Sequence, residues 1–556
     1  MAQTPHRPNI LVLCIDQWDA HMELPEDVQL PALERLERQG VTFDRQYCTV
    51  PICTPSRATM WTGQHAKNVG MWDNTNFAWI TSGRLSPDIP TLGSMLREQG
   101  YYTAFKGKWH LSESVRGEDM LEEYGFADYQ GWGDMFGTPL QGEMLDGTVA
   151  MHSVDWLEHT SPSLDQPWLL ISSLVNPHDI MYFYSDAEVE FPEGGPNLKA
   201  NLTTAQTLGF FKEWNPNLPA NFHDDLSQQP MGVRSYQENI RLTYGMPPPE
   251  REDLWKARRN YLINCMRLVD GELKRILDAL DRLGLWDNTI VVYTSDHGEM
   301  NAAHQMHQKG AIHYDEAAVV NMTAVVPGGP QGVRTPSVGS HLDLVPTLLD
   351  FAGVGEEEMR RRYPQLPGRS LRGAIVQPSE AGPRGSVEQP GDGALICWDG
   401  LNMLDPTWNS TGAIGRLTDL ELDEAGLRSA LRDAGREYGA PDFGRRTFFR
   451  AVVDGRYKLV RWFNPEEYDR PTTIEELYAQ SDVTMHELVD DPGEMENIAR
   501  PDHARYDAQL VERMLVKLNA LIEAELGDDD CPFDLDMFGT REVTYHTKEG
   551  SGSRDD

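Results

Sequence analysis

Cysteine is scarce in this chain, and long apolar runs are missing. The 556 residues include only six cysteines, spread from Cys14 to Cys531, which are too few and too scattered to indicate a disulfide framework. The apolar run Ile10–Ile15 is too short for the core of a secretory signal peptide. No run approaches the roughly eighteen apolar residues that a membrane-spanning helix needs. These absences predict a cytoplasmic protein without a membrane partner.

Basic residues are also in short supply. The chain has 49 lysines and arginines against 87 acidic residues, a formal net charge of −38. This excess of negative charge argues against nucleic acid and anionic membranes as partners. An anionic small molecule would need a local basic pocket, so each cluster of Lys, Arg and His is informative.

Segments typical of strands and of helices alternate through the first two thirds of the chain. This alternation predicts an α/β fold with a large, mostly parallel central sheet flanked by helices. In such sheets, ligands bind beyond the carboxyl ends of the strands. We expect strands at 9–16, 101–105, 167–175, 289–294 and 319–326, and helices at 31–39, 90–99, 252–283 and 341–351.

Composition divides the chain into a large domain that would hold the active site, residues 1–376, a Pro/Gly-rich linker, 377–393, and a smaller α+β subdomain, 394–527. Residues 179–249 are rich in Pro, Asn and Gln and form an insertion, which either roofs the site or decorates the surface. In the subdomain, segments 448–453 and 456–463 predict an antiparallel hairpin. A helix at 504–526 is expected to pack on it.

The C-terminal extension, residues 528–556, mixes acidic residues with an apolar group and ends in a Gly/Ser-rich stretch, which we expect to be disordered. Apolar side chains in a terminal extension favour burial. We predict that they dock on a second subunit, which would make the protein a homodimer or a higher homo-oligomer. The apolar group consists of Phe533, Leu535, Met537 and Phe538.

Polar side chains end two of the predicted strands. Asp16 and Gln17 end the first strand, and Asp296 and His297 follow the strand at 289–294. A single aspartate at a strand end is more often a helix cap, but the carboxyl edge of a sheet can bring two such pairs together. Oxygen and nitrogen ligands suit a hard or borderline divalent cation. This edge is therefore a candidate metal site.

The segment Cys53-Thr54-Pro55-Ser56-Arg57, followed by Thr62-Gly63-Gln64, resembles the maturation signal of type I sulfatases, which belong to the alkaline phosphatase superfamily. The resemblance covers most of residues 8–500. It implies that a formylglycine-generating enzyme converts Cys53 to formylglycine, which carries an aldehyde. A lone cysteine outside such a pattern would be taken as a buried thiol.

The same resemblance places the metal beside residue 53, held by Asp16, Gln17, Asp296 and His297. Many sulfatases have an aspartate where this chain has Gln17, and an asparagine where it has His297. An amide lowers the negative charge of the site, and an imidazole makes it less selective for calcium. One divalent ion is expected, either calcium or manganese, with magnesium as a further candidate.

Basic residues that the resemblance implies for sulfate binding and catalysis follow the strands. Lys106-Gly107-Lys108-Trp109-His110 is similar to a family motif. Ala302-Ala303-His304 stands where the family has Gly-Asp-His, which leaves His304 and His307 open between structural and substrate-pocket roles. The expected catalytic residues are Cys53, Arg57, Lys108, His110, His178 and Lys309.

A mechanism follows as a hypothesis. One hydroxyl of the hydrated aldehyde at position 53 attacks sulfur, while Lys108, Lys309, Arg57 and the metal stabilise charge on the sulfuryl oxygens. His178 or Lys309 protonates the leaving alcohol. His110 then removes a proton from the second hydroxyl, so that sulfate leaves and the aldehyde returns.

The predicted reaction is hydrolysis of sulfate monoesters of aryl or other small alcohols. A phosphonate monoester or phosphodiester hydrolase of the same superfamily is the alternative, because such relatives resemble the chain at Gln17 and His297. They tend to lack the residues matched by Lys108 and His110, which favours sulfate. A non-catalytic binder of sulfated ligands is the second alternative. Trp72, Asn74, Asn76 and Trp79 either line the pocket of the leaving group or serve as packing and turn residues.

Overall fold

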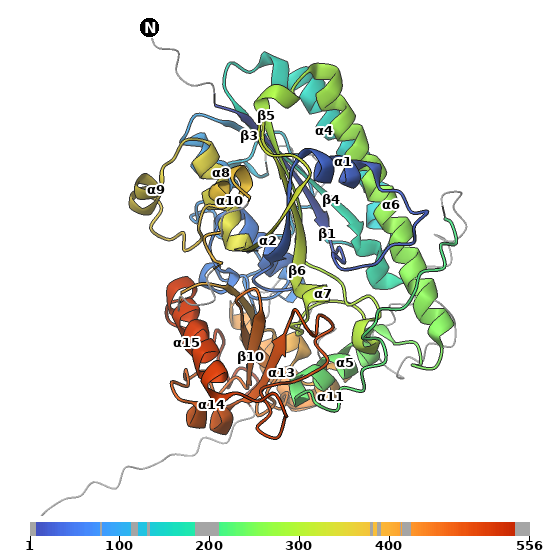
Figure 1. The fold of residues 1–556 in the computed structure, drawn as a ribbon. Helices are drawn as coiled ribbons and strands as arrows, with labels where there is room; N and C mark the ends of the chain where they lie inside the picture. Colours follow the sequence, from blue (N-terminus) through green and yellow to red (C-terminus); the bar gives the residue numbers. More distant parts are fainter. Residues whose placement is uncertain are drawn as a thin grey trace, which may run out of the picture.

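Two sheets form the framework of the protein (Figure 1). The computed structural model describes residues 7–77, 80–112, 120–129, 134–183, 211–378, 382–385, 391–411, 413, 417 and 424–539. Within these residues a seven-stranded sheet occupies the large domain, and a four-stranded antiparallel sheet lies near the C-terminus. No helix in the described part of the chain combines the length and apolar character needed to cross a membrane.

The large sheet has the strand order β3-β4-β1-β5-β6-β2-β7. Strands β3, β4, β1 and β5 run parallel, whereas β6 runs antiparallel to β5 and β2. The mostly parallel α/β sheet predicted from the sequence is confirmed. The strands are β1 (Asn9–Asp16), β2 (Val41–Tyr47), β3 (Tyr102–Gly107), β4 (Trp168–Pro177), β5 (Thr289–Ser295), β6 (Val319–Val325) and β7 (Val333–Ser340).

Helices cover both faces of this sheet, which explains why its central strands are apolar throughout. In β1, Ile10, Val12 and Cys14 belong to one apolar core, and Leu11, Leu13 and Ile15 belong to another. Figure 1 shows α1, α4 and α6 on one side and α2, α8 and α10 on the other. The helices of the large domain are α1 (Pro31–Gln39), α2 (Cys53–Thr62), α3 (Leu92–Arg97), α4 (Gln141–Asp155), α5 (Met231–Tyr244), α6 (Glu252–Leu283), α7 (Asp315–Ala318), α8 (Leu344–Phe351), α9 (Glu356–Arg362) and α10 (Arg372–Val376).

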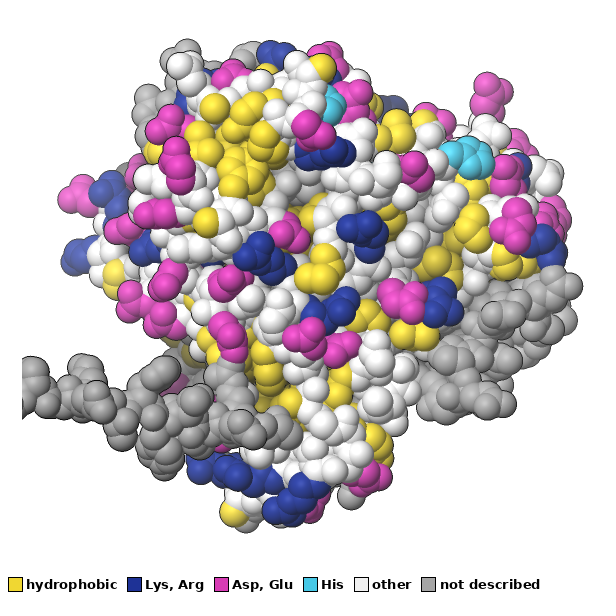
Figure 2. Space-filling view, turned by 90° about the horizontal axis from the view of Figure 1, so that it is seen from below, with side chains coloured by type: hydrophobic (Ala, Val, Ile, Leu, Met, Phe, Trp, Pro, Cys, Tyr) yellow, Lys and Arg dark blue, Asp and Glu magenta, His cyan; other side chains and the backbone are white. Residues whose placement is uncertain are grey.

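The smaller sheet has the order β11-β10-β9-β8. Strands β9 and β10 form the predicted hairpin, and α15 packs its apolar face on the sheet. The elements are β8 (Ala394–Trp398), β9 (Phe448–Val453), β10 (Tyr457–Phe463), β11 (Asp482–Glu487), α11 (Pro406–Asn409), α13 (Glu424–Tyr438), α14 (Ile474–Gln480) and α15 (Ala508–Glu525). In Figure 2, acidic and basic side chains are interspersed over the visible face, so the negative charge is not gathered there into one patch.

The segment predicted as a linker contains a buried arginine. Arg384 contacts Asp343, the residue before α8, at 2.6 Å, and Glu525, the last residue of α15, at 2.6 Å. Both carboxylates and the guanidinium are buried. At this point the segment joins α8 to α15 through a buried pair of ionic contacts, and its assignment as a linker stays a prediction.

The described part of the C-terminal extension packs on its own chain. Phe538 is only 2 % exposed, and its ring centroid lies 5.3 Å from that of Trp408. Phe533 lies edge-on to Phe448 at 6.0 Å. The chain itself thus buries Phe538, while Phe533, Leu535 and Met537 are half-buried, and docking of this group on a second subunit stays a prediction. The homo-oligomer stays a prediction, and the end predicted to be disordered, 540–556, lies outside the described residues.

Candidate active site

The carboxyl ends of β1 and β5 meet the first turn of α2. Asp16 ends β1, Asp296 and His297 follow β5, and Cys53 is the first residue of α2. Cys53 Sγ lies 3.1 Å from His297 Nε2 and 3.7 Å from Asp16 Oδ1. One potential ligand atom from each of the four residues lies within 4.8 Å of the others, and all four residues are buried. The structure therefore brings these sequence-predicted residues together.

The donor atoms of this group fit a divalent cation. Arg57 contacts Oδ2 of Asp296 at 2.8 Å and Oδ2 of Asp16 at 2.9 Å, while the Oδ1 atom of each aspartate lies 3.7 Å from His297 Nε2. His297 Nδ1 lies 2.9 Å from the Gly298 carbonyl oxygen, which places the proton on Nδ1 and a lone pair on Nε2. Oxygen, nitrogen and sulfur donors thus converge on one point.

The electrostatics of the two carboxylates also favour a bound cation. Burial and the neighbouring Asp16 carboxylate raise the pKa of Asp296 to about 7. Burial opposes ionisation of Asp16 too, but Lys108 and the other nearby cations hold its pKa well below the usual range. Two buried carboxylates that compete for the available positive charge are the environment in which a bound cation is favourable.

Gln17 is turned toward a lysine. Its backbone N–H donates to Asp296 Oδ1 at 3.1 Å, and its φ of 63° places it in the left-handed region. The side-chain oxygen accepts a hydrogen bond from Lys309 Nζ, and the side-chain nitrogen donates to Glu299. Gln17 therefore links Lys309 to the edge where the aspartates lie. Its role as a metal ligand stays a prediction.

Arg57 and Lys108 face the two aspartates and do not line the cavity that contains Cys53, and their contact with sulfuryl oxygens stays a prediction. Besides both aspartates, Arg57 donates to the Lys108 carbonyl oxygen at 2.8 Å and to Ser173 Oγ at 2.9 Å. Lys108 Nζ contacts Asp16 Oδ2 at 2.6 Å. Both side chains are 0 % exposed, because burial requires each cation to face a carboxylate.

A cavity of about 520 Å³ opens above Cys53. His110, His178 and Lys309 line it, as predicted for groups that meet a substrate. Its walls are mostly apolar. The remaining lining residues are Ile52, Asn74, Thr75, Phe77, Phe136, Gly137, Thr138, Met181, Tyr182, Tyr244, Gln308, Asn402 and Met403.

Both histidines of the cavity are neutral imidazoles. Burial, together with Lys108 and Lys309, lowers the pKa of His110 and of His178 well below the ordinary value. The Nδ1 atom of each has no hydrogen-bond partner among the described residues. Each histidine therefore keeps an unprotonated nitrogen at neutral pH.

Asp134 holds the segment that carries Lys108 and His110, and the sequence analysis missed it. Its carboxylate accepts hydrogen bonds from the backbone N–H groups of Trp109 at 2.9 Å and His110 at 2.6 Å. Burial raises the pKa of Asp134 to about 6. No sequence motif singles out this aspartate, because it lies 24 residues from His110.

The sequence analysis missed Glu299 and left the role of Asn74 open. Glu299 is buried, contacts Arg258 at 3.1 Å and accepts the hydrogen bond from Gln17. Asn74 Oδ1 accepts the backbone N–H of Thr54 at 3.0 Å, which fixes the start of α2 beside Cys53. Trp72 does not line the cavity, and Trp79 and the side chain of Asn76 lie outside the described residues.

His304 and His307 pack away from the cavity. His304 stacks on Tyr314 with ring centroids 3.9 Å apart and contacts Asp224 at 2.8 Å. His307 Nε2 lies 2.7 Å from the Gly245 carbonyl oxygen. Neither lines the cavity, so the structure favours the structural role for both. The described ends of the predicted insertion do reach the cavity, through Met181, Tyr182 and Tyr244, while 184–210 lies outside the described residues.

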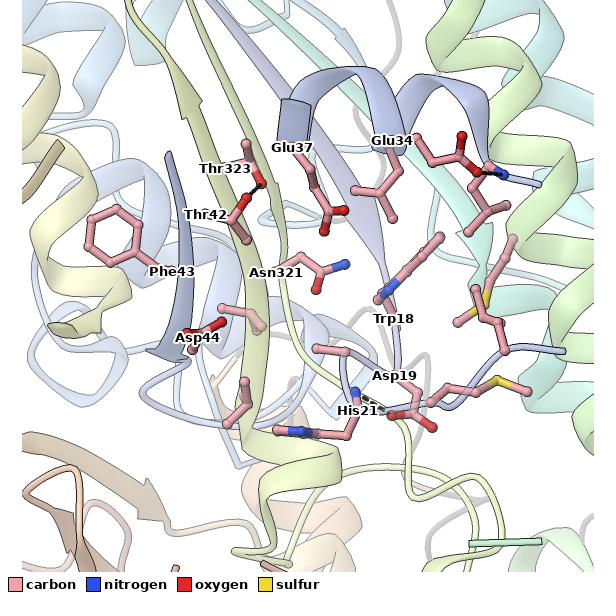
Figure 3. Close-up of a pocket in the computed structure, with 18 of the residues that line it drawn as sticks. Trp18, Asp19, His21, Glu34, Glu37, Thr42, Phe43, Asp44, Asn321 and Thr323 are labelled. Atoms are coloured by element: carbon pink, nitrogen blue, oxygen red, sulfur yellow. Dashed lines mark hydrogen bonds between the residues drawn. The ribbon is translucent and has the colours of Figure 1, made fainter. Parts of the chain in front are cut away.

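Another cavity, of about 490 Å³, lies between α1, β6 and the segment that follows β1 (Figure 3). It shares no lining residue with the cavity above Cys53. Arg334 at this cavity forms ion pairs with Glu37 at 3.3 Å and with Asp44 at 2.7 Å. Asp19 and Glu34 also line the cavity and add negative charge. An acidic lining is unfavourable for an anionic ligand, whereas the cavity above Cys53 is lined by Lys309 and two histidines.

Comparison with known proteins identifies the family. Residues 8–354 match the model of the sulfatase family. The chain belongs to the sulfatase family. It is thus a sulfuric ester hydrolase, as the sequence predicted, and the matched region contains Cys53, both aspartates and all the basic residues of the cavity.

Similar sulfatases occur in bacteria and in animals. The chain is 27 % identical over 433 residues to the uncharacterized sulfatase YidJ of Escherichia coli, covering 70 % of this chain and 77 % of that protein. It is 28 % identical to the choline-sulfatase of Rhizobium meliloti, over 66 % of this chain and 71 % of the relative. It is 26 % identical to the human arylsulfatase K, over 65 % and 66 %.

Solved structures share the fold. A protein in complex with its substrate D-glucosamine-2-N,6-O-disulfate superimposes with a TM-score of 0.63 at 17 % identity, covering 94 % of this chain and 99 % of that chain. The phosphonate monoester hydrolase of Agrobacterium radiobacter gives 0.59 at 21 % identity, covering 93 % and 96 %. At these identities the likeness shows the fold alone.

Proposed function

We propose that this sulfatase hydrolyses sulfate monoesters of small, uncharged, largely apolar alcohols, aryl alcohols among them. The observation that carries the proposal is the cavity above Cys53, where one lysine and two neutral histidines face apolar walls. Lys309 offers positive charge to the sulfuryl group. The walls offer a place for the alcohol.

Cys53 is the proposed position of the formylglycine. It begins α2 at the base of the cavity, 3.1 Å from His297 Nε2. The other cysteines do not line this cavity. As a formylglycine, residue 53 would offer one hydroxyl of a hydrated aldehyde for attack and a second for release of sulfate.

Asp16, Asp296 and His297 are the proposed metal ligands beside residue 53, with Gln17 as a further candidate. A bound divalent ion would favour ionisation of a hydroxyl at residue 53 and offset charge on the sulfuryl oxygens. Its identity is proposed as calcium or manganese, with magnesium as a third candidate, because carboxylates suit all three ions and imidazole favours manganese.

Arg57 and Lys108 act as positioning residues in this proposal. Arg57 holds both aspartates by their Oδ2 atoms, and Lys108 adds a second cation at Asp16. This arrangement fixes the Oδ1 atoms toward His297 and Cys53. Pre-organised charges of this kind avoid the cost of reorienting groups during the reaction.

His110 and His178 are the proposed proton carriers. Both are neutral, and both face the cavity with Cys53. His110 would accept a proton from residue 53 at the release step. The departing alcohol would take a proton from Lys309, or from His178 once that imidazole has itself been protonated.

The lining of the cavity constrains the alcohol. No acidic side chain is among the described lining residues, and Lys309 is the one charged group there. The quaternary ammonium of choline would therefore find aromatic faces but no carboxylate, and a polysulfated sugar would find too few cations. Phe77, Phe136, Tyr182 and Tyr244 favour a flat apolar group.

Substrate preference tests the proposal directly. Values of kcat/KM are measured for an aryl sulfate, choline sulfate, a sulfated sugar, a phenylphosphonate monoester and a phosphodiester. The aryl sulfate should have the highest value, with weaker activity on the phosphonate. A higher value for the phosphonate or the phosphodiester would favour the alternative, a phosphonate monoester or phosphodiester hydrolase. The observations behind this alternative are the structural neighbour from Agrobacterium radiobacter and the pair Gln17 and His297.

Substitution of the nucleophile tests the chemistry. Cys53→Ser should accumulate a covalent ester without sustained turnover, because serine lacks the second hydroxyl. Intact-mass analysis after incubation with the aryl sulfate should show the added mass of one sulfuryl group. Cys531→Ser, at a half-buried cysteine outside the cavity, is the control and should turn over normally. Sustained turnover by Cys53→Ser, or an unmodified thiol in the active wild type, would contradict the scheme.

A further inference from the structure

A second group of metal-ligating side chains lies where the large domain meets the small sheet. His313 precedes α7, His486 lies on β11, and Glu494 follows β11 in the next loop. All three residues are at most 1 % exposed. One ligand atom from each lies within 4.8 Å of the others, and none of the three lines the cavity above Cys53.

The two imidazoles face each other at the spacing that a tetrahedral ion needs. His313 Nε2 and His486 Nε2 are 3.3 Å apart. Two nitrogens bound to a tetrahedral zinc ion at about 2.0–2.1 Å are separated by about 3.3 Å. His486 Nδ1 lies 3.0 Å from the Glu496 carbonyl oxygen, which places its proton on Nδ1 and leaves a lone pair on Nε2.

Burial favours the neutral form of both histidines, which is the form that binds a metal ion. Burial lowers the pKa of His486 to about 3 and that of His313 well below the ordinary value. The Nδ1 atom of His313 has no hydrogen-bond partner among the described residues. With its proton on Nδ1, His313 would also direct a lone pair from Nε2 toward His486.

The carboxylates near the two histidines outnumber the cations that contact them. Lys458 Nζ contacts Asp315 at 2.6 Å and Glu494 at 2.8 Å, and it donates to the His313 carbonyl oxygen at 2.9 Å. One ammonium thus serves two carboxylates, and Glu316 adds a third negative charge nearby. Burial, with Asp315 and Glu316 nearby, raises the pKa of Glu494 although Lys458 contacts it, so a further cation beside this carboxylate would favour its ionised form.

We propose that His313, His486 and Glu494 bind a zinc ion, separate from the ion of the active site. Two imidazoles and a carboxylate are a donor set that zinc accepts, and imidazole disfavours calcium. Glu494 Oε2 also accepts the backbone N–H of Asp315 at 2.7 Å, so the fourth position is left for a water molecule. His313 lies four residues after Lys309, so the ion would fasten the segment that carries Lys309 to β11.

The competing interpretation has no ion. In that case His313 Nε2–H donates a hydrogen bond to His486 Nε2, and Lys458 is the resident cation. This arrangement pairs the two Nε2 atoms but leaves His313 Nδ1 without a partner among the described residues and the carboxylates with one ammonium. The two interpretations differ in zinc content, which is measurable.

The experiment uses the full-length chain, stripped with a chelator and titrated with Zn²⁺ against a chromophoric competitor, with bound metal counted by mass spectrometry. It is done in the wild type and in His297→Ala, which removes a ligand of the active-site ion. His486→Gln is combined with each. His304→Gln is the matched control, because this histidine is also buried and near the group but faces Asp224.

The proposal expects His297→Ala to retain one tightly bound zinc ion and the His297→Ala, His486→Gln chain to lose it, with affinity at least about 100-fold weaker. Zinc should raise the unfolding temperature of His297→Ala by about 5 °C, and His304→Gln should bind normally. Co²⁺ in the same chain should give the visible absorption of a tetrahedral site. If His486→Gln fails to fold, Glu494→Gln takes its place.

The proposal is overturned if His297→Ala binds no tight zinc, or if neither His486→Gln nor Glu494→Gln changes its affinity. Failure of the active-site assignment has a different signature. In that case wild type and His297→Ala bind the same single ion, which is lost only with His486 or Glu494.

Discussion

At the scale of single residues, the site depends on groups that do not touch the cavity. Arg57 holds Asp16 and Asp296, Glu299 holds Gln17, and Asp134 holds the backbone of Trp109 and His110. Arg57 and Glu299 are buried and Asp134 is half-buried, so each depends on its partners for stability. Such residues set the geometry in which His110 and Lys309 can act.

Asp134 gives a prediction for the acid limb of the pH profile. Its pKa is raised to about 6 by burial, so the carboxylate is ionised above that pH and protonated below it. Protonation turns one oxygen into a donor and weakens its hold on the N–H groups of Trp109 and His110. We therefore expect kcat/KM to fall as the pH drops through about 6.

Asp134→Asn should lower kcat/KM about tenfold at pH 8, the loss that corresponds to one charge-assisted hydrogen bond, and should flatten the acid limb. The control is Asp128→Asn, whose carboxylate accepts hydrogen bonds from Tyr102 and Trp156. An acid limb that is the same in Asp134→Asn and wild type would assign it to another group.

At the scale of elements, the ends of β3 and β4 position the lysine beside Asp16. Gly107 ends β3 at φ 94° and pairs with Ser173 of β4. The next residue, Lys108, donates its backbone N–H to the Ser173 carbonyl oxygen at 2.8 Å. A Cβ atom on Gly107 would lie 1.9 Å from that oxygen. The strand end is therefore built for glycine.

Gly107→Ala should destabilise the protein by about 3 kcal/mol, because the new methyl group meets backbone and the φ is strained. It should also lower activity, because Lys108 is displaced. Chemical denaturation and steady-state kinetics measure the two effects. Gly100→Ala is the control: its φ is 82°, yet no atom lies within 4 Å of the added Cβ. Equal losses in the two variants would show that the contact with Ser173 is unimportant.

At the scale of the whole molecule, buried ion pairs of Asp529 and Arg384 connect the small sheet and α15 to the large domain. Asp529 contacts Arg450 at 2.6 Å and Lys67 at 2.5 Å, and Arg384 joins Asp343 to Glu525. One apolar core contains residues of α2, β9 and α15 together. The smaller part of the chain is thus packed on the larger one as a continuation of its core.

Deletion of residues 528–556 should lower the unfolding temperature by about 5 °C, because it leaves Arg450 with Asp399 alone and exposes the pocket of Phe538. Calorimetry measures this effect, and a chain that ends at Gly539 is the control. Light scattering on the full-length chain tests whether the predicted oligomer forms, and light scattering on the deletion variant tests whether the extension contributes to its interface. Since Phe533 and Phe538 pack within the chain, we expect the oligomeric mass to stay the same. An unchanged unfolding temperature would contradict the structural role.

Long regular segments could be predicted from the sequence, and irregular ones could not. The bounds of β1, α1 and α6 match the predicted ranges, because each has an apolar pattern of one period and a clear stop. Strand β2, with exposed Asp44 in its middle, and α4, interrupted by Gly142 and Gly147, have no such pattern. Their structure comes from neighbours supplied by distant parts of the chain.

The amino-acid sequence by itself determined which residues end β1 and β5, and that the segment at Cys53 resembles a sulfatase maturation signal, because these depend on local order along the chain. Only the tertiary structure decided that Arg57 and Lys108 face carboxylates, that Asp134 and Glu299 support the site, and that the cavity is apolar. Those contacts join residues far apart in the sequence. They are selected by the cost of leaving a buried charge or polar group without a partner, which no local pattern records.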